Sequence, residues 1–157
     1  MTLPDDLATA QALVDQHCHG VLVRDLDRAG LEELISEGGA PAAGATNFDT
    51  PAGLAIRRHC APVLDLPTHA PAEDYLARRT ELGAVEAARR LISGSGTAVF
   101  CVDTGLTPDG LTTPDELARL GGGTAHEIVR LETVAEEVAA AGVEPGEFAD
   151  RVADAVA

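Results

Sequence analysis

The stretch at positions 12–20 (ALVDQHCHG) constrains the fold more than any other part of the sequence. Its apolar start predicts a β-strand, which closes on a His-x-His pair and a glycine. Strand side chains alternate between two faces, so every second residue is expected on one face. These residues are Leu13, Asp15, His17 and His19. Two imidazoles at this spacing can reach one divalent ion, although His-x-His alone is also common among surface and core histidines.

Two further stretches are predicted to be strands, and helical segments separate all three. Thr97 to Val102 is β-branched, aromatic and uninterrupted, as in a strand buried on both faces. His126 to Glu132 is expected to form the third strand. Strands that alternate with helices favour parallel pairing, in either a barrel or an open doubly wound sheet.

A mostly helical insertion is expected over residues 35–95, between the first two strands. Threonine-proline pairs at 50–51 and 113–114 each place an N-cap residue before a proline at the first helical position. A longer helical region at 71–92 is expected to break at Gly83. The remaining helices are predicted at Pro4–Ala10, Leu31–Ile35, Val134–Ala141 and Pro145–Val156.

The charge balance excludes several classes of partner. The chain of 157 residues has 26 acidic and 11 basic residues and a formal net charge of −15. This acidity argues against nucleic acid and anionic membranes as partners and leaves a small-molecule substrate. All the basic residues are arginines, so the chain offers no P-loop lysine, Schiff-base lysine or carboxylated-lysine bridge between metals.

Cysteine usage and the N-terminal sequence favour a cytoplasmic protein. Cys18, Cys60 and Cys101 are odd in number and widely spaced, which excludes a zinc ribbon and fits a reducing compartment. The acidic start of the chain lacks the apolar core of a secretion signal. No apolar run approaches the roughly 18 residues of a membrane span.

The His-x-His strand resembles the first-strand motif of the amidohydrolase superfamily, in particular its amidohydrolase-related hydrolases and decarboxylases. The resemblance rests on Val14–Gly20 (VDQHCHG), with Ala98–Leu106 (AVFCVDTGL) and His126–Glu137 (HEIVRLETVAEE) as the next two strands. It implies an α/β fold of the (β/α)8 TIM-barrel type. A whole barrel takes about 250 residues. The chain, taken as one unit over 1–157, is therefore expected to hold a partial barrel of three β/α units.

In this family the first-strand histidines bind a divalent metal, so the resemblance implies that His17 and His19 are metal ligands. Further histidines and an acid–base aspartate come from later strands in the family. Zinc is the first expectation, with manganese or iron as alternatives. The ion would activate water or polarise a carbonyl, in hydrolysis or decarboxylation next to a carbonyl group.

Five other residues are candidates for contacts to the substrate or to the histidines: Asp15, His69, Asp103, Arg130 and Glu132. Asp103 ends the second strand, either as a site residue or as a turn aspartate. Arg130 and Glu132 are expected to end the third strand on one face, to hold a substrate carboxylate or to pair with each other. Asp15 either orients the histidines or is a buried polar residue, and His69 lies in a loop that can cap the site.

Three functions compete on this evidence. The first is the N-terminal part of an amidohydrolase-type enzyme. The second is a non-catalytic truncated α/β protein or interaction module, and the third is a small open α/β binding module. Because the family's later ligands are missing, the isolated chain is expected to be inactive. Unpaired strand edges favour self-association or complementation by the missing barrel part.

Overall fold

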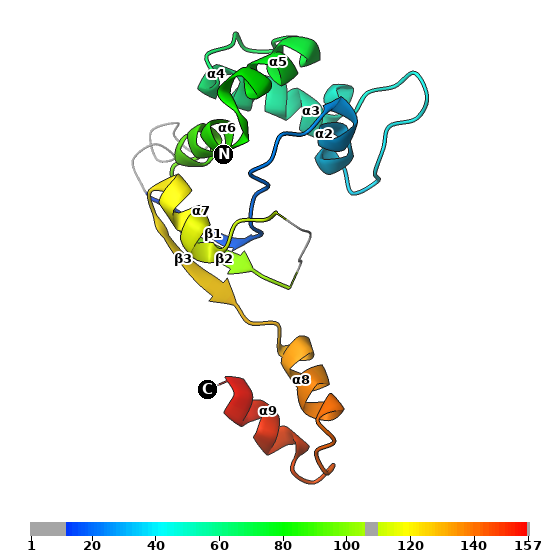
Figure 1. Cartoon of the computed structure of the whole chain (residues 1–157), viewed down its shortest axis with the longest axis vertical. Helices are drawn as coiled ribbons and strands as arrows, with labels where there is room; N and C mark the ends of the chain where they lie inside the picture. Colours follow the sequence, from blue (N-terminus) through cyan, green and yellow to red (C-terminus); the bar gives the residue numbers. More distant parts are fainter. Residues whose placement is uncertain (1–11, 106–109, 157) are drawn as a thin grey trace, which may run out of the picture.

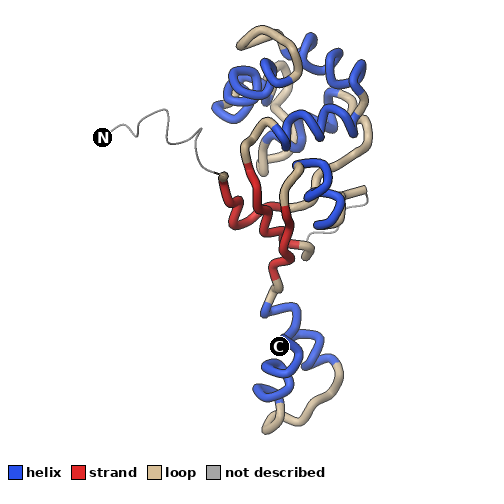
Figure 2. Tube along the Cα trace, turned by 90° about the vertical axis from the view of Figure 1, so that its left-hand side faces the viewer, coloured by secondary structure: helices blue, strands red, loops and turns tan. Residues whose placement is uncertain are grey.

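Residues 12–105 and 110–156 are described by the computed structural model, and they form a small parallel sheet with helices (Figure 1). The strands are β1 (Leu13–Cys18), β2 (Thr97–Asp103) and β3 (Thr124–Ile128), in the order β1-β2-β3. Figure 2 shows the three strands side by side, with most of the helices gathered at one end of them. The first two strands confirm the sequence-based prediction closely.

The third strand lies earlier in the chain than predicted. Gly123 passes so close to β2 that a Cβ atom there would overlap the carbonyl group of Ala98. This close approach lets pairing begin at Thr124. The strand ends at Ile128, and helix α8 (Leu131–Ala140) begins shortly afterwards.

The predicted helical insertion is confirmed, since no strand occurs between residues 35 and 95, all of which are described. Thr50 caps its helix by accepting a hydrogen bond from the Gly53 N–H, and Gly83 separates two helices with a φ of 78°. The helix predicted at Pro4–Ala10 lies outside the described residues. The helical segments up to β2 are α2 (Arg28–Ile35), η1 (Asn47–Asp49), α3 (Pro51–Ala55), η2 (Ile56–Cys60), α4 (Ala61–Val63), α5 (Ala72–Leu82) and α6 (Ala84–Ser93).

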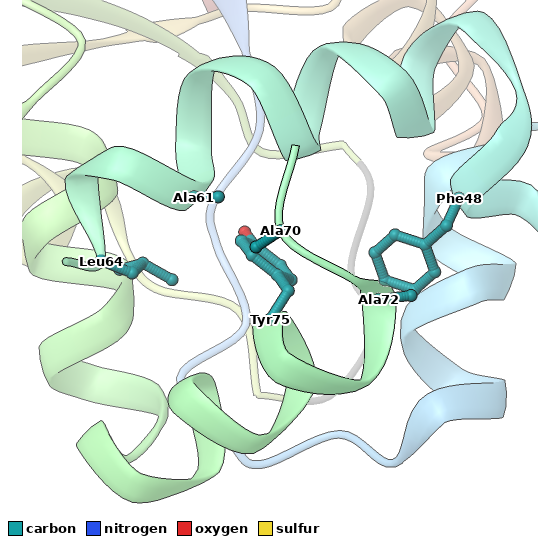
Figure 3. Packing of buried hydrophobic residues seen from close by; sticks show 6 residues of the cluster. All are labelled: Phe48, Ala61, Leu64, Ala70, Ala72 and Tyr75. Atoms are coloured by element: carbon teal, nitrogen blue, oxygen red, sulfur yellow. The ribbon is translucent and has the colours of Figure 1, made fainter. Parts of the chain in front are cut away.

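The larger hydrophobic core lies inside this helical block. Its fully buried members include Phe48 and Leu64, and Tyr75 is also buried (Figure 3). The Phe48 and Tyr75 rings meet edge to face with centroids 6.1 Å apart, a favourable arrangement for aromatic pairs. The block therefore has its own packed interior and does not depend on the sheet to bury its apolar side chains.

Gly53 is expected to be irreplaceable in this block. An added Cβ would overlap the backbone of Asn47 and Phe48, whose atoms cannot move aside cheaply. Gly53→Ala should therefore lower the free energy of unfolding by about 1–3 kcal/mol, because overpacking outweighs the better helix propensity of alanine. Urea unfolding measures the change. The control is Gly30→Ala in α2, where the new methyl group meets only side chains, and an equal loss in both variants would contradict the packing argument.

A second, smaller core joins the sheet to helix α7 (Pro114–Gly121). Phe100 and Val102 of β2 pack with Leu117 of α7, and Cys18 of β1 packs against them. A complete capping box between Thr113 and Glu116 begins α7.

The partial TIM barrel implied by the resemblance is wrong for the described residues. Helix α8 packs against α9 (Phe148–Val156), and the pair lies beyond the end of β3 instead of returning over the sheet (Figure 1). A barrel requires each helix to pack back over the strands, which this hairpin does not do. The fold is an open three-stranded α/β sheet with edges at β1 and β3.

None of the helices within the described ranges has the length and apolar character needed to cross a membrane.

Candidate metal site

A β-bulge interrupts β1 at the first of the two histidines. Between Asp15 and Cys18, β1 has two residues where β2 has one. An extra residue turns the following side chains to the opposite face of the sheet. Asp15 and Cys18 are consequently paired with Phe100 and Val102, whereas the ligand atoms of His17 and His19 gather at Asp103, beyond the end of the paired region. The expectation that Asp15 shares a face with the histidines stays a prediction.

The backbone of β2 orients the His19 ring. Its Nδ1 lies 3.0 Å from the carbonyl oxygen of Asp103. A carbonyl only accepts hydrogen bonds, so Nδ1 carries the proton and Nε2 of the neutral ring holds the lone pair. The His17 ring lies edge to face against His19, with centroids 5.5 Å apart. This hydrogen bond leaves His19 Nε2 available to a metal ion, as is usual for ligating histidines.

Asp103 is a buried carboxylate at the end of β2, only 3% exposed. Arg130 donates from Nε to Oδ1 at 2.8 Å and from Nη2 to Oδ2 at 2.7 Å. The Gly105 N–H also donates to Oδ1, at 2.8 Å. These donors, Arg130 first, hold the pKa of Asp103 well below its usual range and outweigh the effect of burial. Asp103 is therefore a fixed negative charge.

His17, His19 and Asp103 bring three potential ligand atoms together, all within 4.8 Å of one another. His17 Nε2 lies 3.6 Å from Asp103 Oδ2, too far for a hydrogen bond but compatible with two groups that share an ion. The His17 side chain is 59% exposed, so the cluster is open to solvent. Two imidazoles and one carboxylate suit zinc, manganese or iron, and the donor set therefore fits a divalent metal.

The other two charged candidates near the strand ends belong to the start of α8. Arg130 is the residue before this helix, and Glu132 lies in its first turn, so neither ends a strand as predicted. The partner of Arg130 is Asp103, and among the described residues Glu132 forms no ion pair with Arg130. Arg130 was expected to bind a substrate carboxylate or Glu132. Its guanidinium group binds Asp103 instead.

Asp15 and His69 are not brought into the cluster. The Asp15 carboxylate accepts the backbone N–H of His17 at 3.2 Å and does not orient an imidazole. His69 belongs to the helical block, where its backbone N–H donates to the carbonyl of Arg57 at 2.9 Å. A role for either residue in substrate binding stays a prediction.

Gly105 contributes to the site and was not predicted. A Cβ atom at this position would overlap the Arg130 side chain, so only glycine lets the guanidinium lie over the turn and reach Asp103. The Asp-Thr-Gly sequence after β2 signals a turn. It does not signal that an arginine from a distant part of the chain lies over that turn.

Comparison with known proteins yields one informative likeness. No family model matches the chain, and no curated protein matches it significantly. A solved structure of a "putative metal-dependent hydrolase" from Lactobacillus casei has a TM-score of 0.59 and 19% sequence identity. The likeness covers 95% of this chain and 39% of that one. This chain thus spans well under half the length of its neighbour, and the likeness is one of fold.

Proposed function

We propose that the chain carries the metal site of a metal-dependent hydrolase of the amidohydrolase type. The observation that carries this proposal is the cluster of His17, His19 and Asp103, whose ligand atoms lie within 4.8 Å of one another. The fold likeness to a protein described as a metal-dependent hydrolase supports it. The proposed substrate is a small molecule with a hydrolysable or decarboxylatable group next to a carbonyl.

Each residue of the cluster has a proposed role. His19 would bind the ion through Nε2, His17 through a ring nitrogen, and Asp103 through its carboxylate. Three protein ligands and an open position are typical of catalytic zinc sites, so zinc is proposed first, with manganese or iron as alternatives. A divalent ion at this position supplies Lewis acidity toward a carbonyl group. Arg130 and Gly105 keep Asp103 anionic and fixed in direction.

We further propose that this chain alone binds metal without turning over substrate. Hydrolysis requires a group that accepts a proton from water. Arg130 is a permanent cation, and Asp103 is engaged by Arg130 and Gly105. Within residues 12–105 and 110–156 the cluster contains no further carboxylate or imidazole. This lack of a proton acceptor equally supports the second candidate function, a non-catalytic metal-binding α/β module.

Zinc titration of the purified chain tests the metal site. We expect about one equivalent of zinc to bind, and both His17→Ala and His19→Ala to weaken binding at least tenfold, since each removes one of about three protein ligands. His59→Ala is the matched control, because His59 is an exposed histidine of the helical block. Calorimetry and elemental analysis after dialysis measure affinity and stoichiometry.

Two results would contradict the proposal. The first is wild-type chain, folded by circular dichroism, that retains no zinc. The second is zinc that binds equally well to the His17→Ala and His19→Ala variants. A panel of amide, ester and carboxylate substrates separates the two candidate functions, because turnover by the chain that is lost in His17→Ala would show it to be a complete catalyst.

A further inference from the structure

We infer that an apolar cavity beside His19 is a binding site for a small organic anion with an apolar body. The cavity holds about 350 Å3 and lies between the segment that follows β1, helix α2 and helix α6. Its wall is almost wholly aliphatic. The main wall residues are Leu22, Leu26, Leu31, Leu34, Leu91 and Ile92. Ligand sites in proteins are typically cavities of about 300–1,000 Å3 with apolar walls and few polar groups.

Two polar side chains reach this apolar wall, His19 and Arg79. His19 lies at the end next to the metal cluster, with its Nδ1 already bonded to the Asp103 carbonyl. Arg79 comes from α5, and its guanidinium carbon lies 6.0 Å from the centre of the Tyr75 ring. The cavity therefore joins the metal cluster at one side to a cationic group from the helical block.

Arg79 differs from the other arginines of α5 and α6. Arg78, Arg89 and Arg90 each form ion pairs with carboxylates of the same block. Arg79 forms none with any carboxylate that the structure describes. A partly buried guanidinium on an apolar wall favours an anion, and its planar fork can bind a carboxylate through two parallel hydrogen bonds. The occupant is thus a carboxylate with an aliphatic or aromatic body.

Only one part of this inference rests on the proposed function, namely that the bound molecule is a substrate. A molecule whose apolar body fills the cavity places its polar atoms at the two polar side chains, Arg79 and His19. The histidine side is where a carbonyl group would meet the metal. The cavity itself is built from aliphatic side chains and Arg79, so anion binding does not require an ion at the cluster.

Octanoate is the probe, and calorimetry with the full chain measures its binding in the absence of metal. We expect Arg79→Gln to weaken binding roughly tenfold through loss of a charge-assisted contact. Arg58→Gln, at an exposed arginine of the same block, should leave binding unchanged. Octanamide, which has the same body without the charge, should bind roughly tenfold more weakly than octanoate.

Cavity filling tests the location of the site. Ala88→Met fills the cavity from its buried α6 wall, and Leu34→Trp does so from a position that is 60% exposed and tolerant of a larger side chain. Both should abolish octanoate binding, whereas Leu54→Trp, at an exposed leucine away from the cavity, should not. The melting temperature of each variant confirms that it is folded.

The outcomes separate this inference from the metal proposal. Equal octanoate binding by the wild type, Arg79→Gln and Leu34→Trp would overturn the inference, because the octanoate would then bind outside the cavity. Wild-type chain that binds zinc but no octanoate would also overturn it while the metal proposal stands. Octanoate binding that survives in His17→Ala but not in Leu34→Trp supports the cavity, whatever the zinc titration gives.

Discussion

Replacing Phe48 with alanine is expected to lower the free energy of unfolding by about 3–5 kcal/mol. Phe48 is fully buried and meets Tyr75 edge to face in the core of the helical block. Truncation removes the buried ring with its contact to Tyr75 and leaves a cavity in the core. Typical domains have only about 5–15 kcal/mol of stability, so the variant would be partly unfolded at moderate temperature.

Urea unfolding followed by circular dichroism measures this loss. Leu54→Ala is the control, because Leu54 lies in the neighbouring helix α3 but is 45% exposed. The control should cost less than about 1 kcal/mol, since little buried surface is removed. A Phe48→Ala variant as stable as Leu54→Ala would show that the helical block is not packed around this ring.

Replacing Asp103 with asparagine is expected to weaken zinc binding at least about 100-fold, because the change removes a charged ligand as well as the partner of Arg130. Asparagine keeps the shape of the side chain, so the variant tests charge with little change in volume. Glu132→Gln makes the same chemical change at an exposed carboxylate on the adjacent helix. The control should bind zinc like the wild type.

Competition with a chelator of known zinc affinity measures how tightly the Asp103→Asn and Glu132→Gln variants bind zinc. Equal zinc binding by Asp103→Asn and the wild type would remove Asp103 from the ligand set and leave the two histidines alone. A loss of binding in Glu132→Gln would instead show that general negative charge near α8 attracts the ion. In either case circular dichroism must first show that the variant is folded.

The elements predicted correctly are those fixed by short-range chemistry. The threonine-proline pairs at 50–51 and 113–114 begin helices because capping and a preset φ act within one turn. Gly83 divides α5 from α6 because it adopts a positive φ. The uninterrupted apolar run after residue 96 forms the central strand of the sheet. It could be predicted because its composition alone suits a strand that is buried on both faces.

The parts that could not be predicted depend on contacts between distant residues. The bulge after Asp15 appears only when β1 is paired with β2, and no residue in β1 signals it. The ion pair between Asp103 and Arg130 likewise depends on how β2 pairs with β3. Sequence periodicity placed β3 too late in the chain and so assigned Arg130 to the strand. Barrel closure was inferred from a local motif, whereas closure depends on helices packing back over strands, and α8 packs on α9 instead.

The position of Tyr75 limits what optical methods can see in this protein. It is the only tyrosine, and the sequence contains no tryptophan. Tyr75 is buried in the core of the helical block, beside Phe48 (Figure 3). Intrinsic tyrosine fluorescence therefore reports on that block alone, because the sheet that carries the histidines contains neither tyrosine nor tryptophan. A tryptophan introduced on β3 would be needed to follow the sheet and the helical block as separate signals.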